Sequence, residues 1–154
     1  MKITILSKLE FGQIMRQSNV TNNNIGDKDV FIISVNNSVY YDTKSYFEGC
    51  VSENVLRLYF DDISEPEEPF RMFSEEDASS IVDFVKYIDE KKTENTHIII
   101  HCSAGKNRSG SIGKFISDYF DYGFDRLISE NPQIMGNPVV STLLYREWLY
   151  KDNL

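Results

Sequence analysis

The chain is expected to form a single α/β domain whose central, mostly parallel sheet is flanked by helices. Two observations predict this class. Short apolar runs rich in β-branched residues recur along the chain, and amphipathic stretches of helical period separate several of them. Strands that alternate with helices usually form a parallel sheet covered by those helices. The 154 residues, of which 41% are hydrophobic, predict one domain over 1–154 with a substantial core.

The first elements can be assigned from short patterns. Ile3–Leu6 predicts a first strand and Glu10–Gln17 a short helix, and the polar, glycine-containing stretch Ser18–Lys28 predicts a loop. Val30–Val35 (VFIISV) is almost continuously apolar, which is typical of a strand buried on both faces. Asn54–Phe60 (NVLRLYF) alternates apolar and polar residues and predicts another strand.

An acidic, proline-bearing stretch, DDISEPEEP, follows this strand and predicts a mobile loop. Ser74 then caps a helix, because Ser-Glu-Glu-Asp resembles a capping box with Asp in place of Glu or Gln. Apolar residues recur at helical spacing from Ala78 to about Lys91. A helix is therefore expected between the acidic loop and the next apolar run.

The last predicted strand is Thr96–Ile100, which ends at His101–Cys102. Helices are expected over Arg108–Tyr122 and from Asn137–Pro138 to Tyr150, where proline suits the first helical position. Ligands of open parallel sheets bind beyond the carboxyl ends of the strands. Cys102 falls at such an end.

Composition and charge limit the partners. The net charge of −8 argues against nucleic acid or an anionic membrane as the main partner, and no apolar run is long enough to span a membrane. The N-terminal MKITILSKLEF lacks an apolar segment of signal-peptide length. Two cysteines and two histidines are too few for a disulfide framework or a Cys/His zinc site. A reducing, cytoplasmic setting without a metal is expected, and the oligomeric state is left open.

The stretch HCSAGKNRS, residues 101–109, carries the chemistry. Five residues separate Cys102 from Arg108, at a strand-to-helix turn where backbone N–H groups and the helix dipole can bind an anion. The same field favours the thiolate form of a cysteine placed at its centre. Arg108 can hold two phosphate oxygens, and the Ser109 hydroxyl can hydrogen-bond the sulfur as it leaves. The residues expected to surround the substrate are Ser103, Ala104, Gly105, Lys106, Asn107 and Arg108.

This pattern resembles the signature of the cysteine-dependent protein tyrosine phosphatase superfamily. The likeness extends to Asn54–Pro66, to the helix that begins after Ser74 and to the helix after Arg108, about two thirds of the chain. At this length it looks like the compact dual-specificity or small bacterial and viral members. The resemblance implies hydrolysis of phosphotyrosine in proteins through a cysteinyl-phosphate, with phosphoserine and phosphothreonine as further candidates. No cofactor is implied.

The resemblance also implies a general acid upstream of the signature. The family carries it as an Asp, often in Trp-Pro-Asp, with a proline four residues further on. Pro66 stands four residues after Asp62, so this spacing selects Asp62, with Asp61 as the runner-up because the tryptophan and first proline are missing. A solvated acidic turn is the alternative for the pair.

Other residues near the signature have alternative interpretations. Cys102 alone could be a buried core cysteine. His101 could fix the loop and tune the thiolate or serve the fold only, and Lys106 resembles a loop lysine of inositol-lipid phosphatases or is simply solvated. Cys50 could form a disulfide with Cys102 on oxidation or remain a buried thiol. Asn137 could support the site from behind or cap the last helix.

Three further functions compete with the protein phosphatase. The same loop could act on an inositol phosphate, a lipid or an RNA 5′-phosphate, although Glu65, Glu67 and Glu68 disfavour such highly charged substrates and could instead favour peptides with basic flanks. The chain could be a catalytically silent phospho-binding module, which would be expected to lose Cys102, Arg108 or the acid. A rhodanese-like sulfurtransferase also places a cysteine after a strand, but the Cys-to-Arg spacing favours phosphatase chemistry.

Overall fold

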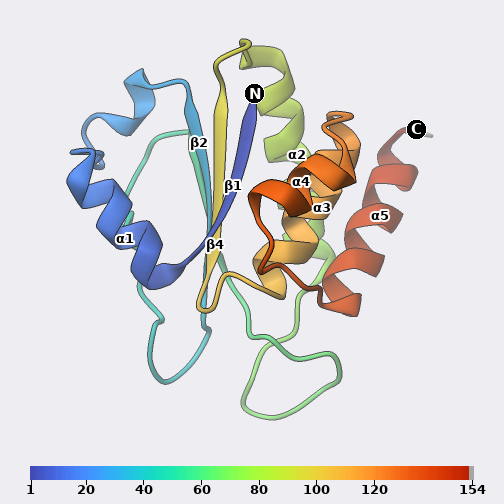
Figure 1. Cartoon of the computed structure of the whole chain (residues 1–154). Coiled ribbons are helices and arrows are strands. Elements are labelled where there is room, and N and C mark those ends of the chain that lie inside the picture. Colours follow the sequence, from blue (N-terminus) through green and yellow to red (C-terminus); the bar gives the residue numbers. More distant parts are fainter. Residues whose placement is uncertain (153–154) are drawn as a thin grey trace.

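The computed structural model describes residues 1–152 and shows a four-stranded sheet between two layers of helices (Figure 1). All strand pairs described are parallel, in the order β1-β4-β2-β3. The strands are β1 (Lys2–Ser7), β2 (Val30–Asn36), β3 (Val55–Tyr59) and β4 (His97–Cys102). The helices are α1 (Lys8–Gln17), the short 3-10 helix η1 (Ile25–Asp27), α2 (Glu75–Lys91), α3 (Arg108–Tyr119), α4 (Phe124–Glu130) and α5 (Pro138–Asp152). The predicted fold class is confirmed.

The central strand β4 explains where the predicted site lies. It pairs with β1 on one side and β2 on the other, and Ile100 stands opposite both Ile5 and Ile33. All three isoleucines are buried. Because the strands are parallel, the ends of β2, β3 and β4 open onto the same edge of the sheet, beside the signature loop.

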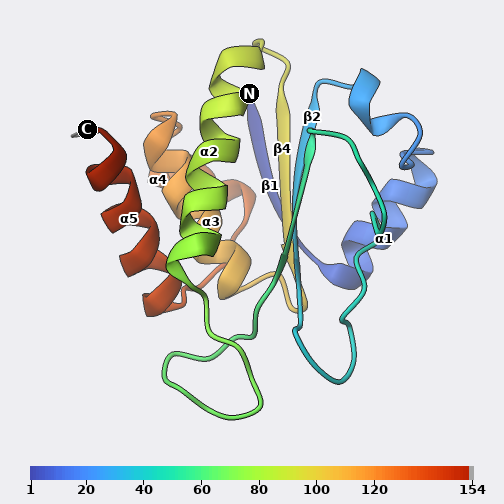
Figure 2. The same ribbon diagram turned by 180° about the vertical axis from the view of Figure 1, so that it is seen from behind.

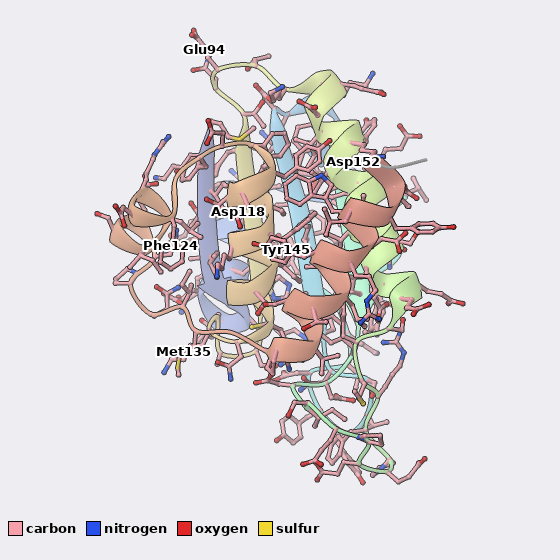
Figure 3. All side chains as sticks on the ribbon, turned by 90° about the vertical axis from the view of Figure 1, so that its right-hand side faces the viewer. Glu94, Asp118, Phe124, Met135, Tyr145 and Asp152 are labelled. Carbon is pink, nitrogen blue, oxygen red and sulfur yellow. The ribbon has the colours of Figure 1, made fainter. Side chains whose placement is uncertain are left out.

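Helices cover both faces of the sheet. Helix α1 lies on one face, while α2, α3, α4 and α5 lie on the other (Figures 1 and 2). Figure 3 shows α3 and α5 side by side, with the Tyr145 hydroxyl donating a hydrogen bond to the Asp118 carboxylate. The larger core packs under α2, α3 and α5, and the smaller core includes Phe11 of α1 and Phe47 of the segment after β2.

Local sequence sets the helix starts. The Ser74 hydroxyl accepts a hydrogen bond from the Asp77 amide while Asp77 accepts one from the Ser74 amide, which is the predicted capping box. Ser7 and Glu10 form a second box, so α1 begins at Lys8 directly after β1 and two residues earlier than predicted. Pro138 is the first residue of α5, as predicted.

The structure differs from the sequence prediction around the end of α3. The helix stops at Tyr119 rather than Tyr122, because the chain turns through positive φ angles at Asp121 (53°) and Gly123 (97°). Helix α4 follows and was not predicted: it has seven residues, of which only Leu127 is buried, so it shows no helical period. No helix among residues 1–152 is long and apolar enough to cross a membrane.

Candidate active site

The signature residues connect β4 to α3. Cys102 is the last residue of β4, residues 103–107 form the loop, and Arg108 is the first residue of α3. The first turn of a helix has free backbone N–H groups and the positive end of its dipole. The loop therefore surrounds a point that favours an anion.

Gly105 and the loop carbonyls set the shape of the loop. Gly105 has φ +69°, and a Cβ there would lie 2.5 Å from the Leu6 carbonyl carbon, so only glycine fits. The carbonyl oxygens of Ser103 and Lys106 accept hydrogen bonds from the amides of Lys8 and Met135 outside the loop. Because the C=O and N–H of one peptide group point in opposite directions, the N–H groups of Ala104 and Asn107 are expected to face the inside of the loop.

Cys102 is 2% exposed, and its sulfur lies 3.0 Å from the Ser109 hydroxyl. The preceding His101 is fully buried; its Nε2 lies 2.6 Å from the Ser34 hydroxyl and its ring stacks on Phe11. Burial above all, together with the positive charges of Lys8 and Arg108, lowers the pKa of His101 to about 3. The imidazole next to Cys102 is therefore neutral near pH 7 and is held by Ser34 and Phe11.

Arg108 is a buried cation with neutral partners. It is 4% exposed, and its guanidinium donates hydrogen bonds to Asn37 Oδ1 (2.9 Å), the Phe60 carbonyl (2.8 Å) and Ser103 Oγ (3.1 Å). Its Nε has no hydrogen-bond partner among residues 1–152. Within the same residues no carboxylate forms an ion pair with it. A buried charge of this kind is stabilised when an anion binds.

Asp61 and Asp62 have different environments. Asp61 is 6% exposed and accepts hydrogen bonds from the Ser38 amide and hydroxyl and from the Arg71 amide. Burial raises the pKa of Asp61, but these hydrogen bonds and the positive charge of Arg108 outweigh it, so the pKa is lowered. Asp61 thus anchors its loop as a carboxylate.

Asp62 is exposed and reaches the signature loop. Its Oδ2 accepts a hydrogen bond from the Asn107 side chain (2.9 Å), and its Oδ1 accepts one from the Asn137 side chain (3.0 Å). The structure therefore brings Asp62, rather than Asp61, to the signature loop, where both of its carboxylate oxygens accept hydrogen bonds from side-chain amides. This geometry favours Asp62 as the acid.

A cleft of about 450 Å³ opens above Arg108. Ser103 and Asp62 lie on its wall, and Tyr40 and Phe70 form an aromatic pair there with ring centroids 5.9 Å apart. Tyr40 is 71% exposed on this wall. No local sequence pattern distinguishes Tyr40, because the segment after β2 approaches the loop that contains Asp61 and Asp62 only in the folded chain.

The remaining predicted residues are placed as follows. Ala104 and Lys106 are exposed, and Lys106 has the environment of a solvated side chain. Cys50 and Cys102 are both free, and they belong to different core clusters, so the structure gives no support to a disulfide between them. Asn37, directly after β2, was not predicted as a site residue, because only the fold brings it to Arg108. Asn137 was considered as a support for the site or as a cap of the last helix, and its side chain contacts both Asp62 and the first turn of α5. Among residues 1–152 no group of three or more His, Cys, Asp or Glu side chains could hold a metal ion.

Comparisons with known proteins find similarity in part of the sequence and in the fold. A family model described as protein-tyrosine phosphatase matches residues 70–117, a span that includes Cys102 and Arg108. No curated protein matches the sequence significantly.

Among solved structures, Tk-PTP in its active form is 17% identical, with a TM-score of 0.53 over 96% of this chain and 91% of that one. Two structures of PTPMT1, one in complex with PI(5)P, are 16% and 13% identical. The first covers 84% of this chain and 83% of its own, and the second 95% and 88%. Their TM-scores are 0.46 and 0.48. The family match across the signature loop and the fold shared with Tk-PTP support the resemblance found in the sequence, that to the cysteine-dependent protein tyrosine phosphatase superfamily.

Proposed function

We propose that this chain is a cysteine-dependent phosphomonoesterase that hydrolyses phosphotyrosine in proteins, with phosphoserine and phosphothreonine as further candidates. The observation that carries the proposal is Arg108: a 4% exposed guanidinium without an ion pair among the described residues, with Nε unpartnered, six residues after a buried cysteine. A phosphate dianion in the loop would supply the missing charge and the missing acceptor.

The proposed reaction has two steps. The Cys102 thiolate attacks phosphorus, the S–P bond forms, and the P–O bond to the leaving group breaks while Asp62 gives that oxygen a proton. Water then attacks the cysteinyl-phosphate, Asp62 takes a proton from it, and the S–P bond breaks. The Ser109 hydroxyl, 3.0 Å from the sulfur, stabilises the departing thiolate. Arg108 and the loop N–H groups stabilise the phosphoryl oxygens throughout.

The walls of the cleft support an aryl phosphate as substrate. Tyr40 and Phe70 present aromatic rings beside Arg108, where the ring of a phosphotyrosine could pack. Glu67 also lines this cleft, and its negative charge disfavours inositol phosphates, phospholipids and RNA 5′-phosphates. A phosphopeptide is therefore the favoured substrate class.

The test is hydrolysis of p-nitrophenyl phosphate and of one peptide prepared with phosphotyrosine, phosphoserine or phosphothreonine, in EDTA and a reductant. Cys102→Ser is expected to abolish turnover. Cys50→Ser is the matched control, because Cys50 lies in the other core cluster, and it should keep the wild-type rate.

The outcomes separate the candidate functions. Turnover that is abolished in Cys102→Ser and fastest with phosphotyrosine supports the proposal. Phosphopeptide binding without turnover would favour a silent binding module. Faster hydrolysis of an inositol phosphate or an RNA 5′-phosphate would replace the proposed substrate class.

A further inference from the structure

Asn137 connects the loop that carries Asp62, here called the acid loop, to the body of the protein. It immediately precedes α5 and is 4% exposed, and its side-chain nitrogen donates hydrogen bonds to Asp62 Oδ1 (3.0 Å) and to the Ile63 carbonyl (3.1 Å). Asp62 lies 75 residues away in the sequence. One buried carboxamide therefore holds both the side chain and the backbone of the loop that carries the proposed acid.

The orientation of this carboxamide is determined by its neighbours. Asn137 Oδ1 accepts hydrogen bonds from the amides of Val139 (3.0 Å) and Val140 (3.3 Å) in the first turn of α5. Those N–H groups require the oxygen on the helix side, so the NH₂ group must face the acceptors of Asp62 and Ile63. The same side chain caps α5 and donates to the acid loop.

The backbone of Asn137 is fixed to α3. Its amide donates to Ser111 Oγ (2.7 Å), and the Ser111 hydroxyl lies 3.1 Å from the Asn137 carbonyl. Ser141 donates a hydrogen bond to the same Ser111 oxygen (3.0 Å). Because Ser111 stands one turn after Arg108, Asn137 is held by the helix that also carries the phosphate-binding arginine.

We propose that Asn137 is a positioning residue for the general acid, an inference that rests on the proposed function. By holding Oδ1 of Asp62, it turns Oδ2 toward the signature loop, where Oδ2 now meets the Asn107 side chain at 2.9 Å. Oδ2 is then the oxygen that gives the proton to the leaving group, and the leaving oxygen replaces Asn107 as its partner when substrate binds.

The expected defect depends on the leaving group. Asn137→Ser keeps an oxygen able to cap α5 but is too short to reach Asp62, so the helix remains and the acid loses its orientation. For phenyl phosphate, whose leaving group needs the proton, we expect kcat/KM to fall about tenfold or more. For 2,4-dinitrophenyl phosphate, whose leaving group needs little protonation, the fall should stay below about threefold.

Two controls separate positioning from a general effect on the fold. Ser141→Ala removes one hydrogen bond from the same cluster without touching the acid loop, and it should change kcat/KM equally little for both substrates. In an Asp62→Asn background, Asn137→Ser should cause no further loss with phenyl phosphate, because the group that it positions is already absent.

The remaining outcomes distinguish a failure of the role of Asn137 from a failure of the proposed function. Equal losses on both substrates, the same selective loss in Ser141→Ala, or an additional loss in the Asp62→Asn background would overturn the role of Asn137 while the proposed function stands. A wild-type protein that hydrolyses neither aryl phosphate would overturn the proposed function and this inference with it.

Discussion

Asp61 and Asp62 are adjacent in the chain, and replacing each by asparagine is expected to give opposite results. The Asp61 carboxylate is buried and accepts hydrogen bonds from the Ser38 amide (3.0 Å), the Ser38 hydroxyl and the Arg71 amide (2.8 Å). The Asp62 carboxylate is exposed and accepts hydrogen bonds from two side-chain amides. Asp61→Asn should therefore lower stability, and Asp62→Asn should lower catalysis.

The cost of Asp61→Asn follows from these contacts. Asparagine has one acceptor oxygen, so if that oxygen stays with Arg71, its NH₂ group faces the Ser38 N–H. A buried donor left without an acceptor costs about 1–3 kcal/mol, and the other hydrogen bonds lose their charge assistance. We expect a loss of about 2–3 kcal/mol, which lowers Tm by roughly 4–12 °C for a domain of this size.

The cost of Asp62→Asn should appear in the rate instead. Its exposed position predicts a change in stability of about 1 kcal/mol or less. Loss of a general acid lowers the rate by about 10²–10⁴-fold when the leaving group needs a proton. Thermal unfolding followed by circular dichroism and kcat/KM for phenyl phosphate, measured on both variants, test the two expectations together.

The opposite pattern would refute this reasoning. If Asp61→Asn kept its Tm and lost the rate while Asp62→Asn kept the wild-type rate, Asp61 would be the acid. The spacing to Pro66 would then have selected the wrong carboxylate. If neither variant lost activity on phenyl phosphate, the loop would not supply the acid at all.

Three further predictions concern the signature loop. Gly105→Ala should inactivate the protein and lower its Tm. The left-handed backbone conformation alone costs alanine about 1–2 kcal/mol, and the Cβ would collide with the Leu6 backbone. An active, equally stable variant would contradict the loop geometry. Ser109→Ala should slow breakdown of the cysteinyl-phosphate, seen as a larger pre-steady-state burst of nitrophenol; an unchanged burst and kcat would refute its role. The unfolded-state pKa of His101 is near 6.5 and its folded pKa is about 3, so the unfolded chain binds a proton first on acidification. The contribution of the neutral His101 to the free energy of unfolding is therefore fully present above pH 6.5 and falls toward pH 3, by up to about 1.4 kcal/mol per pH unit. His101→Gln should flatten this slope in thermal unfolding measured from about pH 7 to about pH 4. An unchanged slope would contradict the buried neutral histidine.

Features set by neighbours in the chain could be predicted. The capping box at Ser74 and Asp77 needs only local geometry, and the run Val30–Val35 identifies a buried strand by its composition. The loop between Cys102 and Arg108 could be located because an apolar strand pattern ends at the first residue and a helical pattern begins at the second. Helix α4 could not be predicted, since seven residues with a single buried apolar position leave no period.

Features that depend on distant contacts required the fold. The partners of Arg108 come from Asn37, 71 residues away, and Phe60, 48 residues away, and Asp62 meets Asn137 across 75 residues. No spacing rule relates such positions, because the order of the strands decides which loops meet at the edge of the sheet.

The sequence by itself determined the α/β class, the capping box at Ser74 and the position of the loop between Cys102 and Arg108, because each rests on hydrophobic period or on hydrogen bonds between near neighbours. Only the tertiary structure decided which aspartate is anchored and which reaches the loop, since burial and partners differ between Asp61 and Asp62 while their chemistry is the same. It likewise decided that Tyr40 lines the cleft and that Asn137 holds the acid loop. The physical reason is that parallel strands bring the ends of distant segments together, and the chemistry of the site is assembled at those ends.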